Sequence, residues 1–160
     1  IDKAYVYKNT GELLREYRYE PPFPALTALS YDGKYLAIAT RDAGTKVFLY
    51  NNETGELMWS KKIEKLTPIL GYIFPLAVSA GGKYVSIRLQ MGVIYLFDNK
   101  GDLLKEWVSE GMVAHPIEAS SKRGVIQHGV PNLLQFINDL LVMRYAEPRF
   151  GCIIERIDKR

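Results

Sequence analysis

The segment 46–59 reads Lys46-Val47-Phe48-Leu49-Tyr50-Asn51-Asn52-Glu53-Thr54-Gly55-Glu56-Leu57-Met58-Trp59. A β-branched and aromatic run comes first, a short polar stretch with Asn and Gly follows, and a second run ends in an aromatic residue. This order predicts a β-hairpin, because glycine accepts a positive φ and an Asn side chain hydrogen-bonds within its own turn.

The same hairpin pattern recurs on either side of this segment, at residues 4–17 and 93–107. The turn glycines Gly11, Gly55 and Gly101 are 44 and 46 residues apart. A second type of hairpin precedes two of them, at residues 29–39 and 78–87, and its turn glycines are 49 residues apart. These spacings agree with the period of about 40–50 residues that four-stranded propeller blades show.

The alternation of residues within the expected strands supports stacked sheets. Between residues 35 and 40, one face of the strand carries Tyr35, Ala37 and Ala39, and the other carries Leu36, Ile38 and Thr40. Both faces are largely apolar, which is expected of a sheet that lies between two neighbours. A generic β-sandwich with repeated turns is the alternative that this pattern leaves open.

Three stretches of the sequence resemble WD40-like and PQQ-like β-propeller repeat proteins. They are residues 30–35, residues 79–84 with the same Gly-Lys-Tyr ending, and residues 52–59. The resemblance covers most of residues 1–110 and implies an all-β toroid of four to eight blades, each of four antiparallel strands. The Gly-His and Trp-Asp dipeptides of WD40 repeats are absent, so the His–Asp relay of that family is not carried over.

The repeats predict how a single propeller domain or fragment at 1–160 is divided. We expect a partial blade at 1–19, blades at 24–65 and 69–110, a degenerate blade at 111–147 and a closing strand at 148–160. The expected inner strand of the degenerate blade is 116–120.

About three and a half blades leave strand edges and apolar faces without neighbours. We expect one of three outcomes, given in order of preference. In the first, the chain is part of a longer propeller. In the second, two copies complete one ring as a homo-oligomer, and in the third, residues 1–19 pair with 151–157 in a small ring. Ile1 is not an initiator methionine, and we expect a processed form or a fragment.

Composition sets limits on the class of protein. The 160 residues are 48% hydrophobic, enough for one domain with a core. The net charge of +3 is too small to indicate nucleic-acid binding. A single cysteine excludes an intrachain disulfide, and no apolar stretch reaches the length of about 18 residues that predicts a membrane span. The compartment is left unassigned.

The sequence shows no pattern that predicts a catalytic, cofactor-binding or metal site. His115 and His128 lack the spacing of zinc ligands, and Cys152 lies in an apolar run typical of a buried thiol. Glu118, expected on an inner strand, is either a buried functional acid or a residue lining a hydrated channel. The glycosylation pattern that begins at Asn52 is expected at an exposed turn.

Loops on a rigid scaffold are where binding residues gather. In a propeller, the loops between the second and third strands of each blade share a rim with the loops between blades. The expected partner-binding rim contains Phe23, Arg41, Asp42, Gln90 and Met91.

The favoured hypothesis is a non-catalytic β-propeller module for protein interaction or scaffolding, with no cofactor. One alternative is a propeller enzyme of the quinone-dependent dehydrogenase type. The other is a structural subunit of a surface layer or filament, in which unpaired edges associate.

Overall fold

A computed structural model describes residues 2–19, 25–42, 44–63, 74–89, 93–109, 123–126, 131–137, 140–145 and 152–156. Side chains are described for residues 3–19, 25–40, 45–63, 76–89 and 93–107. Within these ranges the chain forms fourteen β-strands and one short 3-10 turn at Ala80–Gly82. The expected all-β class is confirmed.

The strands form four sheets. Sheet 1 contains β1 (Asp2–Tyr7) and β2 (Leu13–Tyr19). Sheet 2 contains β3 (Leu26–Leu29), β4 (Tyr35–Asp42), β5 (Gly44–Asn51) and β6 (Leu57–Ile63). Sheet 3 contains β7 (Phe74–Val78), β8 (Tyr84–Arg88), β9 (Ile94–Asp98), β10 (Leu103–Ser109) and β11 (Arg123–Ile126). Sheet 4 contains β12 (Pro131–Ile137), β13 (Leu140–Tyr145) and β14 (Cys152–Arg156).

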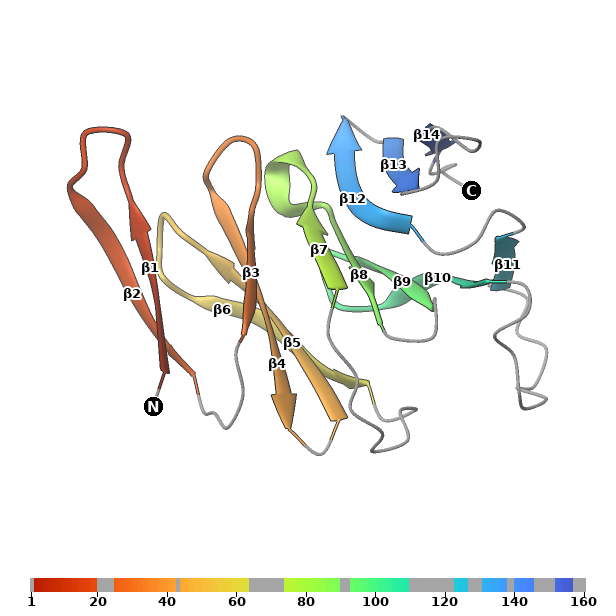
Figure 1. Ribbon diagram of the computed structural model, residues 1–160. Helices are drawn as coiled ribbons and strands as arrows, with labels where there is room; N and C mark the ends of the chain where they lie inside the picture. The colour runs from red at the N-terminus through yellow and green to blue at the C-terminus, as the bar shows by residue number, and fades with distance from the viewer. Residues whose placement is uncertain are drawn as a thin grey trace.

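Sheets 2 and 3 each contain four consecutive antiparallel strands in sequence order, as the repeats predict. The sheets lie one beside the next (Figure 1), with β3 and β4 against β7, and β12 against β7 and β8. The first strands of sheets 2, 3 and 4 therefore neighbour one another. This is the arrangement of propeller blades around an axis, and the sandwich alternative is wrong because four sheets are stacked rather than two.

The expected alternation along β4 is confirmed by the two apolar clusters that flank sheet 2. Ala37 and Ala39 belong to the cluster between sheets 2 and 3, which also contains Leu49, Trp59 and Ile87. On the opposite face, Leu36 and Ile38 pack with Val6 and Tyr17 of sheet 1. Ile38 and Leu49 are fully buried, and burial of each such side chain contributes about 1.5–3 kcal/mol to folding.

The region after residue 110 shows pairings that the repeat did not predict. The expected inner strand 116–120 lies outside the described residues. Among the described strands after residue 110, β12 lies against β7. β11 pairs in parallel with the outer edge of β10, where an unpaired strand edge offers hydrogen-bonding groups. The division of the chain into the five expected segments stays a prediction.

The small closed ring is not formed by the described strands. β14 pairs with β13, and β1 pairs with β2, so residues 1–19 do not pair with the strand near 151–157. Within the described ranges, no helix has the length and apolar content that crossing a bilayer requires.

Candidate functional site

Of the five residues predicted to form a partner-binding rim, the structure describes the backbone of two, where β4 joins β5. Arg41 and Asp42 end β4, in register with Thr45 and Gly44. Thr40 and Thr45, just below this hairpin end, are buried. The backbone at Arg41 and Asp42 is therefore anchored to the core, whereas their side chains lie outside the described part of the structure.

Gln90 and Met91 lie outside the described residues, in the connection between β8 and β9. On either side of them, the Leu89 N–H donates to the Val93 carbonyl at 2.8 Å, and Leu89 and Ile94 are buried. The described strand ends on either side of this connection are thus buried, at the place in sheet 3 that corresponds to the β4–β5 connection in sheet 2. Phe23 also lies outside the described residues, between β2 and β3.

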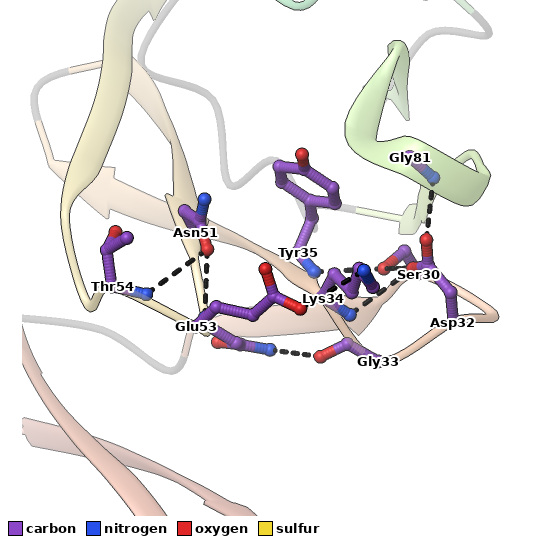
Figure 2. A network of polar contacts seen from close by, with 10 residues as sticks. Ser30, Asp32, Gly33, Lys34, Tyr35, Asn51, Glu53, Thr54 and Gly81 are labelled. Carbon is purple, nitrogen blue, oxygen red and sulfur yellow. Dashed lines mark hydrogen bonds and ion pairs between the residues drawn. The ribbon is translucent and has the colours of Figure 1, made fainter.

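The opposite rim is built from the Ser-containing turns that carried the sequence repeat. Ser30 uses its hydroxyl twice, donating to Oδ1 of Asp32 at 2.6 Å and accepting the Tyr35 N–H at 3.0 Å (Figure 2). The Ser79 hydroxyl accepts the Tyr84 N–H at 2.8 Å in the same way. The repeated motif therefore closes turns, and its conserved spacing within the chain has a structural cause.

Asp32 joins the turn of sheet 2 to the corresponding turn of sheet 3. Its Oδ2 accepts the Gly81 N–H at 2.9 Å, and Figure 2 shows the carboxylate pointing toward Gly81. Partial burial acts to raise the pKa of this carboxyl, but the hydrogen bonds from Ser30, Gly81 and Lys34 outweigh it, so the pKa is lowered. Beside it, a Cβ on Gly82 would lie 2.5 Å from the Tyr35 ring, so the close sheet-to-sheet contact requires glycine.

Asn52 corrects an expectation from the sequence. It is 1% exposed, although the glycosylation pattern was expected at an exposed turn. Its Nδ2 donates to the Gly33 carbonyl at 2.8 Å, and its Oδ1 accepts the Tyr17 hydroxyl at 2.7 Å. The amide nitrogen that a glycan would need is thus occupied inside the fold, and Asn52 ties β2 of sheet 1 to both turns of sheet 2.

Arg15 strengthens the same junction between sheets 1 and 2. Its Nε donates to the Asn52 carbonyl at 2.9 Å, and its Nη2 donates to the Glu53 carbonyl at 2.6 Å. Sequence reasoning missed Arg15, Tyr17 and Asn52. Arg15 and Trp59 both follow their turn glycine by four residues, but this spacing alone does not show which residues of the neighbouring sheet they contact.

The charged side chains of this rim form exposed pairs. Lys34 lies 3.1 Å from Glu53, and Lys8 lies 2.9 Å from Glu12. The hydrogen bond to Glu53 raises the pKa of Lys34. Exposed pairs of this kind contribute little to stability, because solvent screens them.

Among the described residues, no group of three or more His, Cys, Asp or Glu side chains is arranged to hold a metal ion. His115, Glu118 and His128 lie outside the described residues. Cys152 is in β14, but its side chain is not part of the described set. The predictions made for these four residues therefore stay predictions.

No model of a known protein family matches the sequence, and no curated protein matches it. Solved structures do match the fold. The chain superimposes on the β-propeller domain of Myceliophteria thermophila Cps50 (Swd1) with a TM-score of 0.57 and 14% identity, covering 98% of this chain and 48% of that one. For the WD40 domain of Neurospora crassa Pan2 the TM-score is 0.53 and the identity 14%, with 96% and 41% covered.

The chain has a β-propeller fold. A third propeller neighbour is the dihydro-heme d1 dehydrogenase NirN in complex with DHE, with a TM-score of 0.50 and 18% identity, covering 85% of this chain and 26% of that one. The chain spans less than half the length of each of these three structures. At such low identity, the likeness establishes the fold alone, and any function has to be argued from the residues of this chain.

Proposed function

We propose that this chain is a non-catalytic β-propeller module for protein interaction or scaffolding. Its partner-binding rim is formed by Phe23, Arg41, Asp42, Gln90 and Met91. The observation that carries this proposal is the buried base beneath two corresponding connections of neighbouring sheets. Thr40 and Thr45 anchor one, and Leu89 and Ile94 anchor the other. Short loops held on a rigid base lose little conformational entropy on binding.

The residue types on this rim suit protein recognition. Arginine, methionine and phenylalanine are enriched in protein interfaces, and Arg41 with Asp42 offers both signs of charge to a partner. The opposite rim is chemically different, because Ser30, Asp32 and Asn52 use their polar atoms to build turns and join sheets. This contrast supports assigning partner contacts to the first rim and structural work to the second.

The test compares alanine variants on the two rims. The purified protein is immobilised as bait in cell lysate, bound proteins are cross-linked to it, and the captured proteins are identified by mass spectrometry. Arg41→Ala and Gln90→Ala are expected to lose a partner that the unmodified protein retains. Lys100→Ala and Asn99→Ala remove a positive charge and a carboxamide, as Arg41→Ala and Gln90→Ala do, but from exposed positions of the opposite rim, and are expected to retain the partner. If the Arg41 and Gln90 variants capture every partner unchanged, the assignment of this rim is wrong.

The propeller fold alone does not decide between binding and catalysis, since the fold neighbours include both a WD40 domain and a dehydrogenase. An absorbance spectrum of the purified protein separates the two. A stoichiometric quinone or metal would overturn the non-catalytic proposal in favour of the dehydrogenase alternative. Ordered polymers in electron micrographs that grow with protein concentration would favour the surface-layer or filament alternative.

A further inference from the structure

The outermost strands of sheets 1, 2 and 3 carry corresponding segments with different charges and different neighbours. Each of these strands has a bulge near its turn, and Arg15, Trp59 and Lys105 occupy the first paired position after that bulge. The four residues that follow this position therefore correspond between the sheets. They are residues 16–19 in β2, 60–63 in β6 and 106–109 in β10.

In sheet 3, another strand of the chain is paired with this segment. Residues 106–109 of β10 pair in parallel with β11, and the register places Arg123 opposite Glu106. A sheet edge accepts an added strand of this kind through main-chain hydrogen bonds. The chain thus contains its own example of an extended segment bound at this part of an outermost strand, with opposite charges in register.

In sheet 1, the charged residues of the corresponding segment are paired with one another and with β1. Lys3 Nζ donates to Glu16 at 3.0 Å, and Arg18 Nε donates to Glu16 at 2.9 Å. These two hydrogen bonds lower the pKa of Glu16. The cations on this part of sheet 1 therefore already have a carboxylate partner.

In sheet 2, the corresponding segment carries lysines without such a partner. β6 is the last strand of its sheet and pairs only with β5 among the described strands. Lys61 and Lys62 are exposed, and the register places Lys62 directly opposite Lys46, which is exposed as well. Among the described side chains, none of these three lysines forms an ion pair with a carboxylate. Like charges that face each other across two strands repel, so this edge favours a negatively charged partner.

We propose that residues 60–63 of β6 bind an acidic, extended peptide as an added strand parallel to β6. The orientation and the position are those of β11 on β10. Acidic residues in the peptide complement Lys61 and Lys62. Because neighbouring residues of a strand point to opposite faces, two adjacent carboxylates in the peptide reach both lysines. This edge is a second binding surface, separate from the loop residues of the proposed rim.

The experiment measures the binding of fluorescein-labelled peptides to residues 1–160 by fluorescence anisotropy, at low salt, where charges are screened least. The probe is a peptide of about eight residues, Val-Thr-Val-Glu-Glu-Val-Thr-Val, and its control has lysines in place of the two glutamates. The glutamate peptide is expected to bind saturably, with a dissociation constant below about 1 mM, and the lysine peptide is expected not to bind.

Methylation of the peptide's backbone nitrogens separates strand addition from attraction between charges alone. Every second nitrogen is methylated in one peptide, and the alternate set is methylated in another. Only one edge of an added strand faces β6, so one set of methyl groups is expected to abolish binding and the other to be tolerated.

The protein variant Lys61→Glu/Lys62→Glu is expected to raise the dissociation constant of the glutamate peptide by more than about tenfold. The fold is expected to persist, because Lys62→Glu places opposite charges in register with Lys46, and circular dichroism checks this. The matched control, Lys8→Glu/Lys100→Glu, changes the net charge by the same amount at exposed positions of other sheets. It is expected to leave the dissociation constant within about threefold.

Four results would each overturn the proposal. They are no binding of the glutamate peptide, equal binding of the lysine peptide, equal effects of the two sets of methyl groups, and equal effects of the two double variants. The first result is expected if the lysines on this edge serve only to keep other chains from pairing with it. Gln90→Ala is expected to leave peptide binding within about twofold, so the edge and the proposed rim can be refuted separately.

Discussion

Replacing Asn52 by alanine is the sharpest test of how sheets 1 and 2 are joined. The substitution removes the acceptor of the Tyr17 hydroxyl and the donor to the Gly33 carbonyl, and both bonds lie at a position that is 1% exposed. A tyrosine hydroxyl keeps its proton at neutral pH, and burial raises the pKa of Tyr17 further, so the hydroxyl is a donor to Asn52. The variant leaves two polar groups without their partner in a site that water reaches poorly.

The magnitude follows from the cost of leaving buried polar groups unpaired, about 1–3 kcal/mol for each. Asn52→Ala is therefore expected to lower the free energy of unfolding by about 2–4 kcal/mol. Tyr17→Phe removes only one of the two bonds and is expected to cost about 1–2 kcal/mol. Because the two residues share a hydrogen bond, the double variant should cost less than the sum, with a coupling of about 1 kcal/mol.

The assay is urea unfolding followed by tryptophan fluorescence, at one protein concentration so that any association affects all variants alike. Trp59 lies in the cluster between sheets 2 and 3 and reports on its loss. The control is Asn99→Ala, at an exposed turn position, which should stay within about 0.5 kcal/mol of the original protein. Equal effects of Asn52→Ala and Asn99→Ala would refute the argument that Asn52 joins the sheets.

Three further predictions concern the opposite rim, which carries the Ser30 and Ser79 turns. The pKa of Asp32 is lower in the fold than its ordinary value of 3.8, so the ionised carboxylate stabilises the fold above that pH, and this stabilisation is lost as the pH falls through the folded pKa. Asp32→Asn should therefore make the free energy of unfolding fall less steeply with pH below about pH 4, measured by acid unfolding. Gly82→Ala should lower the free energy of unfolding by more than about 1 kcal/mol, and by more than Gly33→Ala, because both have positive φ but only Gly82 faces a ring at 2.5 Å; equal losses in urea unfolding would contradict this. Lys34→Ala removes only the exposed pair with Glu53 and should leave the urea midpoint unchanged in high salt.

The four-stranded sheets could be predicted from the sequence because their signals are local. The turn residues and the alternation along residues 35–40 lie within one or two hairpins. Turn preferences and the two-residue period of a strand are therefore enough to predict these strands. After residue 110 these signals fade, and the strand order of β11 and β12 was not predicted. Strand pairing over that distance depends on which sheet edge is free.

The candidate site divides in the same way. The sequence placed Arg41 and Asp42 in the loop between two strands, whereas the structure extends β4 through both residues. Their role in a partner-binding rim stays a prediction. The joint made by Arg15, Tyr17 and Asn52 could not be predicted, because residues 35 and more positions apart in sequence meet there. Asn52 reads as an exposed glycosylation site in sequence, and only its neighbours in space show that it is buried.

The repeat by itself determined the class of fold, the turns and the two apolar faces of each central strand, since these depend on contacts between residues close in sequence. The tertiary structure alone decided which side chains join one sheet to the next. Those outcomes depend on packing between separate sheets, and a linear pattern of residue types contains no information on which sheet supplies the neighbouring atoms.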